Sequence, residues 1–374
     1  MRNSYDAVVV GAGVFGAWTA YHLRKSGRSV ALLDAYGPAN SRASSGDESR
    51  ILRMGYGPAE VYTRFALRSR ELWIGLFEAV KQPQLFQQTG ALWTPAPDDP
   101  RGHETRATFR NCEVPFEELG PAELNIRYPQ FRFDSERTGV FEPLAGILLA
   151  RKAVTEVVAD AGHLGVEYFR QAASAPKAGQ LRTSSGGVVH ADLFIYACGP
   201  WLPKIFPDLL QGRIRATRQE VFYFGTPPGD RSFAPPQMPA WIDFADERCP
   251  YVLPEIENRG FKMAFDRHGP EFDPDSGDRL AAGLPGARAF LAERFPRLAE
   301  APLLESRVCQ YENTSNGDFL IDRHPEFENV WLAGGGSGHG FKHGPAVGEY
   351  IAHLVDGKRE PERKFSLATK MLEP

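Results

Sequence analysis

The chain has 374 residues and a formal net charge of −4, with 42% hydrophobic and 24% charged residues. This length is sufficient for two domains, each with its own hydrophobic core. The negative net charge and the lack of a basic tract argue against nucleic acid or an acidic membrane surface as a partner. We therefore expect chemistry on small molecules.

The four cysteines lie far apart in the sequence and show no paired metal-ligand spacing. This pattern fits a reducing compartment, and we expect no metal site. No apolar run approaches the roughly 18 residues of a membrane span, and the first predicted strand begins too early to follow a signal peptide. We therefore expect a cytoplasmic protein with no membrane partner.

The N-terminal segment carries the strongest pattern in the chain. An apolar run leads into Gly11, Gly13 and Gly16, a helical segment follows, and a second apolar run stops at Asp34. This order of strand, glycine turn, helix, strand and acid is typical of a dinucleotide-binding unit.

Each part of this segment has a physical role. Gly11 permits a tight turn, Gly13 lets the backbone approach a pyrophosphate, and Gly16 lets the helix pack close to the strand. The free N–H groups at the helix start, around Val14 and Phe15, would face the anion. The acid after the second strand can accept hydrogen bonds from a ribose 2′-OH, which argues against NADP. These residues alone do not decide between FAD and NAD.

A polar stretch from Gly37 to Asp47 follows and ends in SSGDESRILRMGYG. Loops of this length inside a compact domain are often functional. Arg50 and Arg53 would project to similar sides if this segment started a helical turn. A solvated pair of surface arginines is the alternative interpretation. The apolar periodicity after Pro58 predicts a helix that ends near residue 81.

The remaining patterns predict two interleaved domains. We expect residues 1–82, 144–212 and 305–374 to form an α/β nucleotide-binding domain, and residues 83–143 and 213–304 to form a second domain built on a β-sheet. In the first domain, an apolar strand at 192–197 runs into Gly199, a combination that suits a buried parallel strand.

One strand of the second domain carries charged residues. In the segment Gly260 to Asp266, alternation places Lys262 and Asp266 on the same face. A surface ion pair is the simpler interpretation of this arrangement.

Near the C-terminus, an apolar strand at 330–333 runs into GGGSGHGFKHGPAVGE. These glycines, followed by a helix from about Pro345, let backbone N–H groups approach an anion or a flat ring. Glycine loops at both ends of the chain suit a cofactor longer than one nucleotide, which favours FAD over NAD.

Taken together, these motifs resemble the monomeric sarcosine oxidase group of FAD-dependent amine oxidases, within the D-amino-acid-oxidase superfamily. The similarity rests on the opening fingerprint, the SSGDESRILR loop, the strand around Lys262, CQYENTSNGDFLID and GGGSGHGFK, and it covers nearly the whole chain. It implies a Rossmann-like FAD-binding domain with an interleaved β-sheet substrate domain, and close relationship to fructosyl amino acid oxidases.

The resemblance also implies roles for individual residues. Cys309, which the sequence alone would assign to the core, matches the cysteine that binds the flavin covalently. Arg53 and Lys342 match the pair that holds the substrate carboxylate. Lys262 matches the lysine at which oxygen reacts, and Arg50 and Tyr311 match residues that line the flavin and substrate pocket. The full expected set of cofactor-binding residues is Gly11, Gly13, Val14, Phe15, Gly16, Asp34, Ser45, Arg50, Gly199, Cys309, Gly336, Gly338, Gly340 and Lys342.

The implied reaction oxidises a secondary amine of the N-substituted amino acid type and reduces O₂ to hydrogen peroxide. The imine product is hydrolysed to an aldehyde or keto compound and a primary amine. We expect the amine and O₂ to be the only partners of a monomeric enzyme. A flavin dehydrogenase with another electron acceptor and a non-catalytic flavin subunit are the alternatives.

Two positions depart from the sarcosine branch. A histidine of that branch is replaced by Asp266, and one extra residue lies between the glycine–acid pair of the loop and Arg50, which could change how Ser45 meets the flavin. An anionic group near the substrate favours a substrate with a cation or several hydroxyls. Fructosyl amino acids are therefore an alternative to sarcosine, and Asp266 is a candidate catalytic residue.

Overall fold

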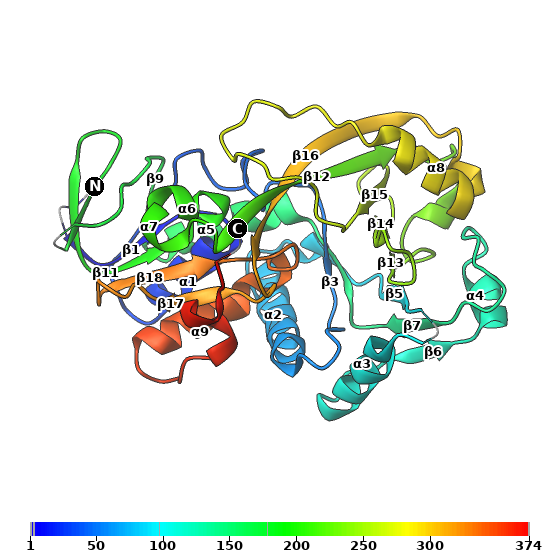
Figure 1. Cartoon of the computed structure of the whole chain (residues 1–374), viewed down its shortest axis with the longest axis horizontal. Coiled ribbons are helices and arrows are strands. Elements are labelled where there is room, and N and C mark those ends of the chain that lie inside the picture. The colour runs from blue at the N-terminus through cyan, green and yellow to red at the C-terminus, as the bar shows by residue number, and fades with distance from the viewer. Residues whose placement is uncertain (1, 3, 97, 178, 373–374) are drawn as a thin grey trace.

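The computed structural model describes residues 2, 4–96, 98–177 and 179–372, and their strands form two large sheets and one small sheet (Figure 1). The first large sheet has the strand order β17-β18-β11-β1-β2-β9, and β10 pairs with β11. Its strands are β1 (Ser4–Val10), β2 (Val30–Leu33), β9 (Glu167–Phe169), β10 (Gln180–Arg182), β11 (Val188–Tyr196), β17 (Leu320–Arg323) and β18 (Val330–Gly334).

The centre of this sheet is parallel. Strands β18, β11, β1, β2 and β9 run in one direction, whereas β17 and β10 pair antiparallel at the sides. Parallel strands are buried on both faces, which explains the uninterrupted apolar run at the end of β1. Helix α1 (Val14–Lys25) packs on α5 (Ala150–His163) and on α9 (Gly344–Val355), and α2 (Glu60–Ala79) packs on α9.

The second large sheet has the order β16-β12-β15-β14-β13-β5-β7-β6. Its strands are β5 (Ala91–Thr94), β6 (Glu117–Leu119), β7 (Gly139–Glu142), β12 (Ile214–Phe224), β13 (Ala240–Asp243), β14 (Pro250–Leu253), β15 (Phe261–Phe265) and β16 (Leu303–Thr314). The long antiparallel pair β12 and β16 forms one edge of the second sheet and extends towards the first sheet (Figure 1). This pair therefore positions side chains between the two halves of the molecule.

The small sheet and the remaining helices connect these parts. The small sheet contains β3 (Arg50–Leu52), β4 (Phe86–Gln87) and β8 (Gly146–Leu148) in the order β3-β8-β4. The other helices are α3 (Pro100–Asn111), α4 (Pro121–Arg127), α6 (Leu202–Ile205), α7 (Pro207–Leu210) and α8 (Leu284–Arg294). None of the described helices is both long enough and apolar enough to cross a membrane.

The helix predicted after Pro58 is confirmed by α2, and the strand predicted at 192–197 is confirmed by β11. The helical turn considered for Arg50 and Arg53 is wrong, because Arg50 begins strand β3, which pairs antiparallel with β8. Local spacing could not reveal this pairing, since the partner strand lies almost one hundred residues away. The predicted boundary at residue 305 falls within β16, which belongs to the second sheet, so the division into two interleaved domains stays a prediction.

Candidate active site

Most of the predicted cofactor residues line one cavity of about 380 Å³. The cavity extends from the β1–α1 turn, past the end of β2, to the glycine loop after β18. The predicted residues on its wall are Gly11, Gly13, Val14, Phe15, Asp34, Ser45, Arg50, Gly199, Gly336, Gly338 and Gly340. Gly16, Cys309 and Lys342 do not line this cavity.

Two glycines of the opening fingerprint are required by close backbone contacts. Gly11 has a φ of +104°, and a Cβ atom there would lie 2.2 Å from the carbonyl oxygen of Ala197. A Cβ atom on Gly16 would lie 1.8 Å from the carbonyl oxygen of Gly11. The structure therefore confirms the tight turn and the close helix packing that the sequence predicts for these positions.

The start of α1 suits an anion. It has no side-chain cap and no acidic residue in its first turn, so the positive end of the helix faces the cavity without a fixed negative charge in that turn. The backbone N–H of Val14 donates to the Oγ of Ser45 over 3.1 Å. Ser45 therefore lies at the helix start and holds the polar loop against it.

Asp34 stands at the end of β2 and lines the same cavity. One carboxylate oxygen accepts a 2.7 Å hydrogen bond from the N–H of Ala12, and the other accepts hydrogen bonds from the N–H groups of Tyr36 and Gly37. The carboxylate thus joins the glycine turn to the loop after β2, at the position where a ribose-binding acid is expected.

A second cavity of about 80 Å³ lies next to the first. Arg50, Tyr311, Gly338 and Phe341 line both cavities. The predicted residues that line the smaller cavity are Arg50, Arg53, Lys262, Asp266, Cys309, Tyr311, Gly338 and Lys342. The structure therefore brings all the predicted catalytic and substrate-binding residues to one place.

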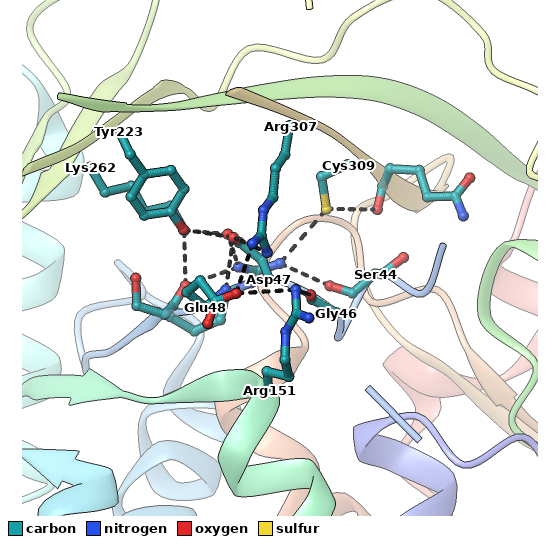
Figure 2. A network of polar contacts seen from close by, with 12 residues as sticks. Ser44, Gly46, Asp47, Glu48, Arg151, Tyr223, Lys262, Arg307 and Cys309 are labelled. Carbon is teal, nitrogen blue, oxygen red and sulfur yellow. Dashed lines mark hydrogen bonds and ion pairs between the residues drawn. The ribbon is translucent and has the colours of Figure 1, made fainter. Parts of the chain in front are cut away.

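Asp47, which sequence reasoning did not select, is the centre of a buried polar network (Figure 2). Its side chain is 3% exposed. It accepts a 2.5 Å hydrogen bond from Arg50 Nη1, a 2.7 Å hydrogen bond from the Tyr223 hydroxyl and a short hydrogen bond from Lys262 Nζ. Arg307 Nη1 lies 3.8 Å from the same carboxylate.

The electrostatics of this network keep Asp47 negatively charged and Lys262 positively charged. Burial would raise the pKa of Asp47, but the cations of Lys262 and Arg50 outweigh burial and hold this pKa well below its usual range. Burial lowers the pKa of Lys262 to about 8, and the nearby Asp47 carboxylate opposes a larger fall. The lysine therefore carries its charge at neutral pH although its side chain is only 2% exposed.

Cys309 lies on β16 at the wall of the smaller cavity and forms no disulfide. Its sulfur accepts a 3.7 Å contact from Arg50 Nη2. The thiol of Cys198 instead donates to the carbonyl oxygen of Val10 over 3.3 Å. Of these two cysteines, Cys309 is the one that lines the smaller cavity and lies beside a cation, Arg50.

Two cations on the other side of the smaller cavity share Tyr56. Lys342 is 5% exposed, and its Nζ donates to the Tyr56 hydroxyl over 2.7 Å and to the carbonyl oxygen of His339 over 2.9 Å. The guanidinium carbon of Arg53 lies 4.8 Å from the centre of the Tyr56 ring. Burial and the charge of Arg53 hold the pKa of Lys342 well below its usual range. Tyr56 follows RMG in the sequence, and nothing in that motif indicated this contact.

The position of Arg53 depends on a buried carboxylate that the sequence also left unidentified. Glu142, at the end of β7, is fully buried and accepts hydrogen bonds from the N–H groups of Met54 (2.6 Å) and Gly55 (3.2 Å). Gly55 in turn accepts a hydrogen bond from Arg53 through its carbonyl oxygen. Glu142 thus fixes the backbone that carries Arg53.

Asp266 follows β15 directly and accepts a 2.8 Å hydrogen bond from the Tyr311 hydroxyl. Protein atoms that surround its carboxylate raise the pKa of Asp266, although the side chain opens onto the smaller cavity. The expected placement of Lys262 and Asp266 on one face is confirmed, because both line this cavity. The simple surface ion pair is wrong, since Lys262 pairs with Asp47 instead.

Comparison with known proteins identifies the family. The family model described as "FAD dependent oxidoreductase" matches residues 6–354. A monomeric sarcosine oxidase of Bacillus sp. (strain B-0618) is 32% identical over 375 residues, which cover 96% of this chain and 94% of the relative. An N-methyl-L-tryptophan oxidase of Yersinia pestis is 28% identical, with 97% of this chain and 99% of the relative covered.

Solved structures show the same fold. The fructosyl amine:oxygen oxidoreductase (Amadoriase I) of Aspergillus fumigatus superposes with a TM-score of 0.79 at 21% identity, over 98% of this chain and 90% of the neighbour. This likeness confirms the D-amino-acid-oxidase-like fold, and the sequence relatives confirm the resemblance to sarcosine oxidases. The chain therefore belongs to the family of FAD-dependent oxidoreductases.

Proposed function

We propose that this chain is an FAD-dependent oxidase of secondary amines, acting on N-substituted amino acids and passing the electrons to O₂. One observation carries the proposal: the cavity at the glycine turn shares part of its wall with a small chamber that is lined by a buried lysine, Lys262, and by the cations Arg53 and Lys342. The curated relatives are named for oxidation of sarcosine and N-methyl-L-tryptophan, both N-methyl amino acids.

The residues of the larger cavity fit FAD. The glycine turn leaves no room for side chains, the start of α1 suits a pyrophosphate, and Asp34 suits a ribose. FAD bound there would accept two electrons from the amine and deliver them to O₂. Cys309 is the proposed covalent attachment point, supported by its free thiol at the wall of the smaller cavity.

Arg53 and Lys342 would hold the substrate carboxylate. Neither residue forms a salt bridge in the described part of the chain, and Lys342 is buried against neutral acceptors. A carboxylate between these two cations would restore charge balance and accept hydrogen bonds from both. This clamp would orient the substrate so that its amine faces the remaining walls of the chamber.

Lys262 would supply the positive charge beside which O₂ gains electrons. The reduction of O₂ builds up negative charge, and a fixed cation in a water-poor site stabilises such charge more strongly than in bulk water. The amine must be uncharged to give up a hydride, so Asp266 and Tyr311 are the candidates for accepting its hydrogen bond. Arg50 lies between both cavities and would contact the flavin as well as the chamber.

There are two candidates for the N-substituent of the substrate, a methyl group and a fructosyl group. N-methyl amino acids such as sarcosine are favoured by the sequence relatives. Fructosyl amino acids are favoured by one structural feature, the Asp266 carboxylate at the chamber wall, which can accept hydrogen bonds from the hydroxyls of a sugar. The printed name of the Aspergillus neighbour, a fructosyl amine:oxygen oxidoreductase, matches this second candidate.

The test is a panel of amines supplied to the purified protein in air, with peroxide release as the readout. The panel contains sarcosine, N-methyltryptophan, pipecolate, proline and fructosyl-valine. Peroxide from any of them supports the oxidase, and the strongest response names the N-substituent. Flavin reduction without peroxide would instead identify a dehydrogenase with another acceptor. Monomeric state and cytoplasmic location are part of the proposal and are checked by light scattering and cell fractionation.

A further inference from the structure

Asp47 lies between two of the functional cations that line the smaller cavity, Lys262 and Arg50. Figure 2 shows Tyr223, Lys262 and Arg307 directed from the overlying strands towards this one carboxylate. All three contacts bridge segments far apart in the chain; the Lys262 contact, for example, spans 215 residues. Asp47 itself is on the polar loop that also carries Ser45. The carboxylate therefore joins that loop to β12, β15 and β16.

Asp47 is the carboxylate that pairs with Lys262, and the other groups around this lysine are cations, tyrosines and a thiol. Arg50 and Arg307 add positive charge near it, whereas Tyr223, Tyr251 and the Cys309 thiol are its other titratable neighbours. Glu48, the next residue along the loop, is engaged elsewhere. Its salt bridges go to the arginines Arg151 (3.1 Å), Arg259 (2.9 Å) and Arg307 (2.8 Å).

We propose that Asp47 is a positioning residue for oxygen reduction, which fixes the Lys262 ammonium at the chamber wall and keeps it charged. This inference rests on the proposed function. The same carboxylate holds Arg50, which contacts the sulfur of Cys309. Asp47 thus sets the spacing between the oxygen-reactive lysine and the proposed attachment point of the flavin.

Removing the negative charge of Asp47 should lower the pKa of Lys262. Burial and Arg50 both lower the pKa of Lys262, and Asp47 is the main group that raises it. Without the carboxylate charge, the lysine pKa falls further below about 8. A fall of about two units would reduce the charged fraction at pH 8 from about one half to about one hundredth. The oxygen reaction should therefore slow at pH 8 and recover at lower pH.

The experiment compares Asp47→Asn, which keeps the shape but loses the charge, with Glu48→Gln as the matched control on the same loop. In the holoenzyme, flavin reduction by amine under anaerobic conditions and flavin reoxidation by O₂ are measured separately from pH 5.5 to 9. For Asp47→Asn we expect reduction within about threefold of wild type, and reoxidation slowed about tenfold or more at pH 8. Its pH profile should move at least one unit towards acid, and that of Glu48→Gln should not move.

A second readout does not depend on turnover. The ¹⁵N resonance of the lysine Nζ, assigned with Lys262→Met, reports the pKa of Lys262 directly, and this pKa should fall in Asp47→Asn and stay within half a unit in Asp47→Glu. An unchanged lysine pKa in Asp47→Asn, or equal slowing of both half-reactions at every pH, overturns the proposal. Should Asp47→Asn fail to fold, a fall of more than one unit in Asp47→Glu, which keeps the charge, overturns it as well. If the wild type oxidises no amine, the proposed function fails, and the resonance still tests the Asp47–Lys262 coupling.

Discussion

Replacing Lys342 by methionine should have opposite effects on activity and stability. The ammonium of Lys342 is buried, and among the described residues it donates only to neutral oxygens, those of Tyr56 and His339. A hydrogen bond from a charged group contributes about 1.5–3 kcal/mol. In the proposed complex, the Lys342 ammonium also donates a hydrogen bond to the substrate carboxylate. The methionine variant lacks this bond to the substrate, so its kcat/KM should be about 10- to 150-fold lower. The free energy of unfolding should rise, by about 1–4 kcal/mol if the gain resembles that from replacing buried charges with apolar side chains.

The pH dependence gives the sign of the stability effect. The pKa of Lys342 in the folded chain lies well below its ordinary value of 10.5. The buried ammonium therefore lowers the free energy of unfolding by its full amount at any pH below the folded-state pKa. This effect disappears as the pH rises towards 10.5, because Lys342 then loses its proton in the unfolded chain as well. The gain in Tm for Lys342→Met should therefore be larger at pH 6 than at pH 9.5.

Lys370 offers a matched control, because it is a buried lysine that lines neither cavity. Lys370 is fully buried, donates to the Asn316 side chain and the Lys364 carbonyl oxygen, and has a pKa lowered by burial to about 8. Lys370→Met should leave kcat/KM unchanged. Thermal unfolding of the holoenzyme at several pH values and steady-state kinetics provide the measurements. A Lys342→Met variant that is less stable than wild type at pH 6, or that keeps its kcat/KM, would refute this reasoning.

Three further changes test individual residues. Cys309→Ala should allow acid precipitation to release yellow flavin into the supernatant, and release of the same colour from the unaltered protein would refute the covalent bond. Lys262→Met should slow flavin reoxidation about 100- to 1000-fold, the range for loss of one charge-stabilising donor, with much less effect on reduction; equal slowing would exclude its role in the oxygen reaction. Asp266→His should shift preference from sugar-bearing substrates towards sarcosine, and an unchanged ratio of kcat/KM values would show that this position does not select the substrate.

The local parts of the fold could be predicted from sequence. Gly11, Gly16 and Asp34 lie within one short segment, and their roles follow from backbone geometry that depends on near neighbours. The pairing of β3 with β8 depends instead on a distant strand, so the spacing of Arg50 and Arg53 suggested the wrong local structure. Propensity is a weak guide where tertiary contacts decide.

The candidate site also contains residues that the sequence identified and residues that only the fold reveals. Motif resemblance placed Lys262, Cys309 and Lys342 at one chamber, and the structure brings them there. Asp47 and Tyr56 were not selected, because each acquires its function from a partner more than 200 residues away. An acid in a polar loop and a tyrosine after a glycine have many other uses in proteins, and only the fold shows that both are buried against functional cations.

The central claim is that an amine reduces a flavin held by this chain and that O₂ then recovers the electrons as peroxide. Stopped-flow absorbance of the purified holoenzyme tests both steps in sequence. Mixing with sarcosine or fructosyl-valine without air should bleach the flavin, and oxygenated buffer should restore the colour with one hydrogen peroxide formed per flavin. A flavin that no N-substituted amino acid bleaches, or that recovers only with an artificial acceptor, would contradict the account.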